Sequence, residues 1–244
     1  LAGSGKPQKK QRDNEKLVNT IMSTSLTRAI AYRMVAGFAK DELLSGVTTI
    51  RTVGGLGDFD TRLRDEIKAG SKIGPRILAS NQGISVPGEL KMPPEMVRAV
   101  CEKAHANGYL VAAHVESPEG VRVALENGVD SIEHGAKLTD EMVKLFKERG
   151  AFLCTTISPA LPYALFDRSI TNATKRSAEL TDIDSITGSI EKGKAADLIV
   201  TAQNPLKDLK ALRNLEMVIS GGRLIEHPKI KKRKQVEAEL DKFL

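Results

Sequence analysis

The chain has 244 residues, 41% of them apolar and 4% aromatic, and a formal net charge of +6. This length suits one large α/β domain, alone or with a smaller second domain, and an aliphatic core typical of parallel sheets covered by helices. No apolar stretch approaches the ~20 residues needed to cross a bilayer, which excludes a membrane partner. The excess charge lies in Lys6–Arg12 and Lys229–Lys234, runs without interleaved aromatic residues, so we expect solvated ends and no nucleic-acid partner.

The chain begins with a polar segment that reaches about Lys16 and lacks the apolar core of a signal peptide. The two cysteines, Cys101 and Cys154, show no metal or redox spacing. We therefore expect a cytoplasmic protein.

The first predicted elements are a helix and a strand. A helical pattern runs over Leu17–Leu44 and ends at Gly46, and the β-branched strand Val47–Thr52 follows. The loop after this strand contains Gly55-Leu56-Gly57 but lacks the spacing of a phosphate-binding loop. This disfavours an α/β-barrel enzyme that recognises phosphate.

The pattern of helix and strand then repeats. We predict a helix over Thr61–Ala69, a strand over Arg76–Ala79 and a helix over Glu95–Asn107 that Pro93-Pro94 opens. His105 lies on the last of these helices, and we expect it to be a surface residue rather than a ligand.

Two histidines mark the centre of the chain. The apolar runs Tyr109–Ala113 and Val129–Ile132 are each followed by a histidine, His114 and His134. Between them, a helix begins with a Ser-Pro cap and ends at Gly128, so the segment predicts two parallel strands joined by a helical crossover. One histidine at a strand end is commonly structural, but two at one sheet edge indicate a metal site.

A further helix and strand extend this series. Thr139 can cap a helix that Gly150 closes, and Phe152–Thr156 predicts a fifth strand. Five strands alternating with helices support a βα-repeating architecture, although five cannot close an eight-stranded barrel.

The rest of the chain departs from this alternation. We predict a helix over Ala173–Leu180, β-like pieces over Gly188–Val200 and Met217–Ile225, and a short charged helix over Lys234–Leu244. The domain boundary is placed at residue 180, with barrel elements in 1–180 and sandwich strands with the last helix in 181–244.

Four stretches of the chain resemble the amidohydrolase superfamily, in its imidazolonepropionase-like and Xaa-Pro dipeptidase (prolidase-like) branch. They are GVTTIRTVGG (Gly46–Gly55), GPRILAS (Gly74–Ser80), AAHVESPEGVRVALENGVDSIEHG (Ala112–Gly135) and TGSIEKGKAADLIVTAQNPLKDL (Thr187–Leu209). The resemblance implies a (β/α)8 TIM-type barrel, incomplete in this chain, with a small β-sandwich. It also implies one or two divalent metal ions, usually zinc, with His114 and His134 as metal ligands after the fifth and sixth barrel strands.

Three groups of the family's ligands have no counterpart in this chain. No His-x-His pair occurs, and neither the lysine of the fourth barrel strand nor the aspartate of the eighth can be placed, so the catalytic residue is unknown. Two histidines alone bind an ion weakly, since a catalytic zinc site has about three protein ligands. We therefore expect one of two origins for this sequence. Either it joins pieces of a longer chain, or it comes from a shortened relative of the family.

The resemblance implies metal-assisted hydrolysis of a C–N bond in a small substrate, such as an Xaa-Pro dipeptide or an N-acyl amino acid. Arg51 and Tyr163 are candidate substrate contacts, although Arg51 could form a buried ion pair instead and Tyr163 could simply pack. The alternative function is a non-catalytic, metal-depleted relative that binds a ligand or partner. Relatives often self-associate, so a homo-oligomer is also expected.

Overall fold

The computed structural model describes residues 14–81, 83, 92–154, 172–230, 238 and 241. Its helices are α1 (Asn14–Met22), α2 (Ser25–Leu44), α3 (Phe59–Lys68), α4 (Pro94–His105), α5 (Pro118–Glu126), α6 (Asp140–Arg149), η2 (Asn172–Arg176), α8 (Ser177–Leu180) and η3 (Leu209–Arg213). Its strands are β1 (Thr49–Arg51), β2 (Arg76–Leu78), β3 (Ala112–Val115), β4 (Ser131–His134), β5 (Phe152–Cys154), β6 (Leu198–Thr201), β7 (Leu215–Ser220) and β8 (Arg223–Glu226).

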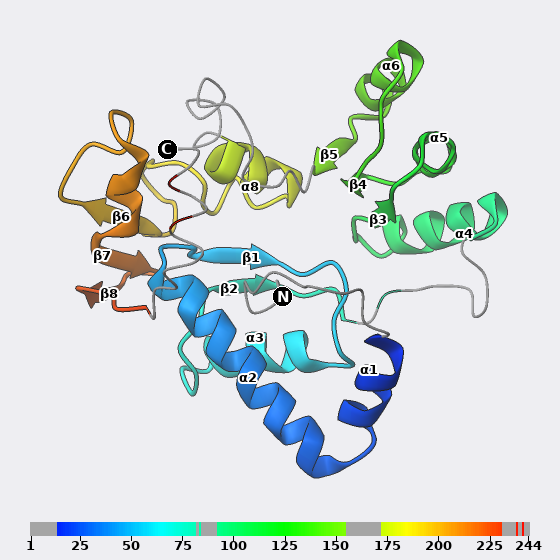
Figure 1. The fold of residues 1–244 in the computed structure, drawn as a ribbon. Coiled ribbons are helices and arrows are strands. Elements are labelled where there is room, and N and C mark those ends of the chain that lie inside the picture. Colours follow the sequence, from blue (N-terminus) through cyan, green and yellow to red (C-terminus); the bar gives the residue numbers. More distant parts are fainter. Residues whose placement is uncertain are drawn as a thin grey trace.

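The first layered unit consists of β1 and β2, paired in parallel, with α2 and α3 on one face of the pair (Figure 1). One face of α2 carries Tyr32 and Ala39, which pack with Phe59 and Leu63 of α3 and with Ile77 of β2. The rings of Tyr32 and Phe59 meet edge to face, with centroids 5.4 Å apart. We call α1–α3 with β1 and β2 the first unit.

The prediction of a single helix over Leu17–Leu44 is wrong, because the chain breaks between α1 and α2. Thr24 takes an extended conformation, with φ −129°, and its side chain accepts a hydrogen bond from the backbone N–H of Thr27. Thr24 is therefore the N-cap of α2. The apolar spacing continues across this cap, which hides the break from a periodicity argument.

The second layered unit consists of β3, β4 and β5, paired in parallel in that order and covered by α4, α5 and α6. Ser117 caps α5 by accepting from the N–H of Gly120, Pro118 occupies the first turn, and Gly128 turns the chain into β4 with φ +96°. The predicted strand, helix and parallel strand are confirmed. We call α4–α6 with β3–β5 the second unit.

The predicted strand Tyr109–Ala113 is displaced along the chain, since β3 covers Ala112–Val115. Tyr109 and Leu110 belong instead to the turn that closes α4, where Tyr109 N–H donates to the carbonyl of Ala104, and they are 69% and 55% exposed. His114 consequently lies within β3 and not beyond it.

The third sheet is antiparallel and contains β6, β7 and β8. Of the β-like piece predicted over Gly188–Val200, only the end is a strand, whereas β7 and β8 account for Met217–Ile225. Asp197 joins this sheet to the first unit: its buried carboxylate accepts from Arg76 Nη1 of β2 at 2.6 Å. Most of the predicted helix Lys234–Leu244 falls outside the described residues.

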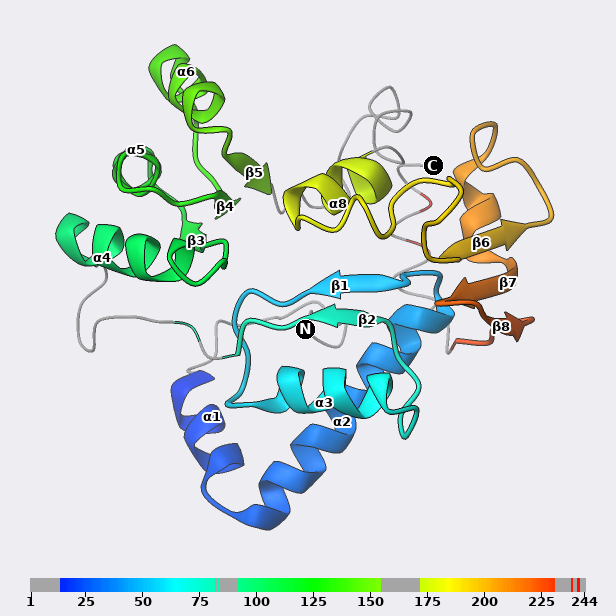
Figure 2. The same cartoon turned by 180° about the vertical axis from the view of Figure 1, so that it is seen from behind.

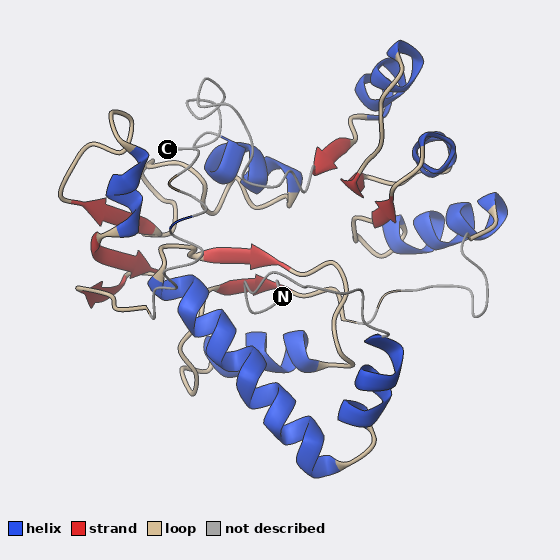
Figure 3. Ribbon diagram, in the orientation of Figure 1, coloured by secondary structure: helices blue, strands red, loops and turns tan. Residues whose placement is uncertain are grey.

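The two parallel sheets lie toward the middle of the molecule, with α2 and α3 outside one and α4–α6 outside the other (Figures 2 and 3). This arrangement is that of a βα barrel wall, but among the described residues the two sheets share no ladder, so the barrel is not closed. No described helix is both long and apolar enough to cross a membrane.

Candidate metal centre

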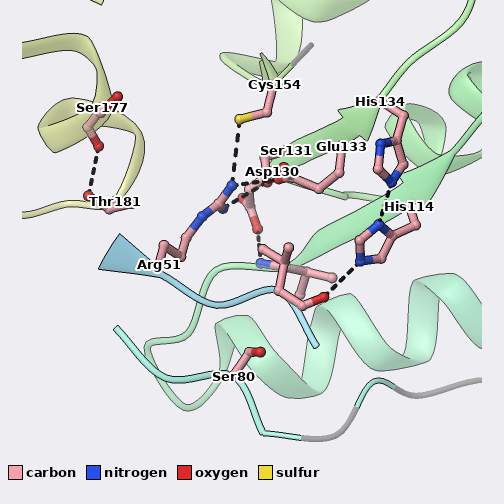
Figure 4. A network of polar contacts seen from close by, with 12 residues as sticks. Arg51, Ser80, His114, Asp130, Ser131, Glu133, His134, Cys154, Ser177 and Thr181 are labelled. Carbon is pink, nitrogen blue, oxygen red and sulfur yellow. Dashed lines mark hydrogen bonds and ion pairs between the residues drawn. The ribbon is translucent and has the colours of Figure 1, made fainter. Parts of the chain in front are cut away.

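Two imidazole rings meet between adjacent parallel strands (Figure 4). His114 Nδ1 of β3 and His134 Nε2 of β4 lie 2.9 Å apart, and the rings stack with centroids 5.0 Å apart and 30° between their planes. His134 ends β4, and His114 precedes only Val115 in β3. The structure therefore brings the two predicted histidines together at the carboxyl edge of the sheet, where α/β proteins assemble ligand sites.

Strand geometry alone would not bring these rings together. In the parallel register His114 pairs with Glu133, while His134 pairs with Val115, so regular alternation would direct the two imidazoles to opposite faces. His134 instead takes the left-handed conformation, with φ +73°, and Gly135 follows with φ +81°. This conformation is rare for a residue other than glycine, and at His134 it accompanies the turn that brings the ring back toward His114.

The first unit fixes which nitrogen of His114 carries the proton. His114 Nε2 lies 2.7 Å from the backbone carbonyl oxygen of Val53, in the loop after β1. A carbonyl oxygen can only accept, so Nε2–H must donate. In the neutral ring Nδ1 then presents its lone pair to His134 and to the space beside the two rings.

A buried carboxylate holds the loop that contains Val53. Asp60, in the first turn of α3, is 5% exposed and accepts from the hydroxyl of Thr52 at 2.6 Å and from the N–H groups of Asn81 and Ser80. Burial raises the pKa of Asp60, but these hydrogen bonds outweigh it and hold the pKa below the ordinary value. Asp60 is therefore a carboxylate that ties together the ends of β1 and β2.

Arg51 of β1 reaches across to the second unit. Its guanidinium forms an ion pair with Glu133 and donates to the hydroxyl of Ser131 at 3.1 Å. Glu133 is 7% exposed and the Arg51 side chain 22% exposed, so the pair is mostly withdrawn from water. The buried ion pair considered for Arg51 is thus present, and its role as a substrate contact stays a prediction.

Cys154 of β5 lies beside this ion pair, with Sγ 3.5 Å from Arg51 Nη2. Burial, followed by the neighbouring charge of Glu133, raises the pKa of its thiol. Cys154 therefore stays a neutral thiol at neutral pH and is no activated nucleophile.

The spacing of the two imidazole nitrogens is close to that of two ligands on one metal ion. Two imidazole nitrogens bound to one tetrahedral zinc at about 2.0–2.1 Å lie about 3.3 Å apart, so the pair needs to open by a few tenths of an ångström. His134 would also have to release the proton on Nε2. Within the part of the chain that the structure describes, no group of three or more His, Cys, Asp or Glu side chains gathers, so the described residues supply two ligands.

The remaining predicted residues lie elsewhere. Tyr163 falls outside the described residues, and His105 lies on the surface of α4, where its Nε2 is 2.8 Å from Asp130 Oδ2. Sequence reasoning missed Asp60 and Glu133. For Glu133 a signal existed, because a charged residue directly after the predicted strand Val129–Ile132 needs a partner if the strand continues, and Arg51 lies in another predicted strand.

Solved structures similar to this chain include proteins named as prolidases and as an amidohydrolase. A protein assigned as a prolidase from Bifidobacterium longum superposes with a TM-score of 0.72 and 28% identity, covering 86% of this chain and 81% of its own. A Xaa-Pro dipeptidase with methionine bound in its active site superposes with a TM-score of 0.67 at 23% identity, covering 83% and 80%, which supports the fold alone.

Sequence relatives match shorter stretches, and no family model matches the chain. An uncharacterized protein of Mycobacterium tuberculosis is 38% identical over 63 residues, 26% of this chain and 17% of its own length. Ochratoxinase of Aspergillus niger is 28% identical over 107 residues, 43% of this chain and 22% of its own. The matches thus span less than a quarter of these relatives. Together with the structural match over most of the chain, they support relatedness to the amidohydrolase superfamily, in its prolidase- and ochratoxinase-like branch.

Proposed function

We propose that the chain contributes to the active centre of a metal-dependent amidohydrolase that cleaves a C–N bond in a small substrate. One observation carries the proposal: His114 Nδ1 and His134 Nε2 lie 2.9 Å apart at the carboxyl edge of adjacent parallel strands. An Xaa-Pro dipeptide or an N-acyl amino acid is the proposed substrate class. The name of the relative assigned as a prolidase supports the dipeptide.

His114 and His134 would hold one of the one or two divalent ions, with zinc as the proposed metal. The chemistry that such an ion supplies is activation of water and polarisation of the scissile carbonyl. His114 is oriented for this role by Val53, and the ring of His134 is placed by its left-handed backbone. Tyr163 and Arg51 remain proposed substrate contacts.

The test uses the whole gene product and substitutes three of the four histidines of this chain. Zinc content is measured for the wild type, for His114→Ala and His134→Ala, and for His227→Ala, whose side chain is 76% exposed and lies at the end of the antiparallel sheet. We expect zinc to be lost in the first two variants and retained in the third. Hydrolysis of Xaa-Pro dipeptides and of N-acyl amino acids should stop on chelation and return with zinc.

A wild type that binds no zinc, or zinc binding that survives both central substitutions, contradicts the proposal. The first of these results would favour the alternative of a non-catalytic binding protein. Comparing the two substrate series then decides which C–N bond is cleaved, since a preference for one over the other is set by loops around the centre.

A further inference from the structure

His114 depends on a neighbour that belongs to another layered unit. Its Nε2–H donates to the carbonyl of Val53, which lies two residues after the end of β1, whereas His114 itself lies in β3. The direction of this carbonyl decides which imidazole nitrogen keeps the proton. Residues that set the conformation at Val53 therefore act on His114 without touching it.

Three side chains set that conformation. Thr52, 8% exposed, donates its hydroxyl to Asp60 and accepts from the N–H of Ser80 at 2.9 Å. The Ser80 hydroxyl accepts from the N–H of Gly54 at 2.8 Å. The peptide group that contains the Val53 carbonyl is thus held through the N–H of Gly54, and the preceding residue, Thr52, is held through its side chain.

We propose that Thr52, Asp60 and Ser80 are positioning residues for His114, which hold the Val53 carbonyl so that Nδ1 presents its lone pair to the metal. The inference rests on the proposed function and assigns the residues that orient one of its ligands. Partners of this kind on a ligating histidine fix its tautomer, and their loss lowers metal affinity by roughly 10–100-fold.

Three substitutions each change one of these side chains while nearly keeping its size. Thr52→Val removes the hydroxyl, Ser80→Ala frees the N–H of the exposed Gly54, and Asp60→Asn removes the negative charge that collects three of the hydrogen bonds. Matched controls are Ser71→Ala, whose hydroxyl bonds only the end of α3, and Asp65→Asn on the exposed side of the same helix. Thr52→Ser restores the hydroxyl.

The first readout is the tautomer of His114 in the metal-free protein, measured by nitrogen-15 NMR at about pH 8.5, where an ordinary imidazole is neutral. We expect the Nε2–H form in the wild type, in both controls and in Thr52→Ser. The other three variants should show a mixture of both tautomers. A merely structural role in closing the loop would leave the tautomer unchanged.

The second readout is zinc affinity, measured by competition with a chelator. We expect a loss of roughly 10–100-fold in Thr52→Val, Ser80→Ala and Asp60→Asn and no change in the controls. An unchanged tautomer in folded Thr52→Val and Ser80→Ala overturns the inference, whatever happens to the affinity. An equal loss in Ser71→Ala or Asp65→Asn overturns it as well.

The same measurements distinguish failure of the proposed function from failure of this inference. If the wild type binds no zinc, the hydrolase proposal falls, and the tautomer readout alone still decides whether the three residues orient His114. If zinc binds and the tautomer never changes, the hydrolase proposal stands and the positioning role falls.

Discussion

The first and second units are built alike but contribute differently to the candidate centre. Each has a short parallel sheet, outer helices and its own core, centred on Leu63 in one and on Leu125 in the other. The second unit carries both histidines, whereas the first supplies the carbonyl that orients one of them. Polar contacts join the two units near the centre: the ion pair of Arg51 with Glu133, and the hydrogen bond from His114 to the backbone carbonyl of Val53. Stability thus resides within each unit, and the centre depends on how the units meet.

Truncating one buried leucine in each core tests whether the two units unfold independently. Leu125 and Leu63 are 0% and 1% exposed, so Leu125→Ala and Leu63→Ala should each lower the free energy of unfolding by about 2–5 kcal/mol. Hydrogen exchange should show loss of protection confined to the unit that carries the substitution. Equal loss in both units after either change would mean that they unfold as one body.

The ion pair between the units should have the next largest effect. Glu133→Gln leaves the Arg51 guanidinium without its charge partner and should cost about 1–3 kcal/mol, less than a fully buried pair because Arg51 is partly exposed. The control is Glu119→Gln, which breaks an exposed pair with Arg122 and should cost less than about 1 kcal/mol. A double-mutant cycle with Arg51→Met measures the coupling energy between Arg51 and Glu133. A coupling energy near zero would mean that this ion pair does not stabilise the contact between the two units.

Acid should weaken the first unit through Asp60. The folded pKa of Asp60 is lowered, so its contribution is fully present above the unfolded value of about 3.9 and is lost as pH falls through the folded pKa. Asp60→Asn should lower the free energy of unfolding by about 1–3 kcal/mol at neutral pH. Chemical unfolding across pH should show the two proteins converging below about pH 4. Parallel curves would mean that the carboxylate charge is not what stabilises the loop.

Helix caps should give small and equal effects in the two units. Thr24 caps α2 and Thr139 caps α6, each through a hydrogen bond to the third residue along. Thr24→Ala and Thr139→Ala should each cost about 1 kcal/mol, and serine at either position should restore most of it. Thermal melts are sufficient for this comparison, and a much larger loss at Thr24 would show that it also holds α1 against α2.

Local signals predicted the second unit well and the first unit less well. Ser117, Pro118 and Gly128 bound α5 with short-range chemistry that is visible in the sequence, and so do Thr139 and Gly150 for α6. The cap at Thr24 escaped, because apolar residues continue on both sides of it. The strand at His114 was displaced, because exposed Tyr109 and Leu110 look like buried strand residues.

The candidate metal centre was likewise predicted in part and missed in part. The two histidines were found because their positions at successive strand ends follow from the pattern of the chain. The contacts of His114 with Val53 and of Arg51 with Glu133 join residues 61 and 82 positions apart, which no local pattern encodes. The left-handed backbone at His134 is equally a product of the assembled sheet, with the following Gly135 as its only hint.

The left-handed conformation of His134 opposes two requirements at a single position: placement of the proposed metal ligand and stability of the fold. A side chain other than glycine costs roughly 1–2 kcal/mol in this region of backbone space, so glycine there would make the fold more stable while removing the imidazole. A relative that no longer needs this histidine for activity would gain stability by replacing it with glycine. A relative that uses the histidine must keep the strained backbone. Selection on activity and selection on stability therefore act in opposite directions at this residue.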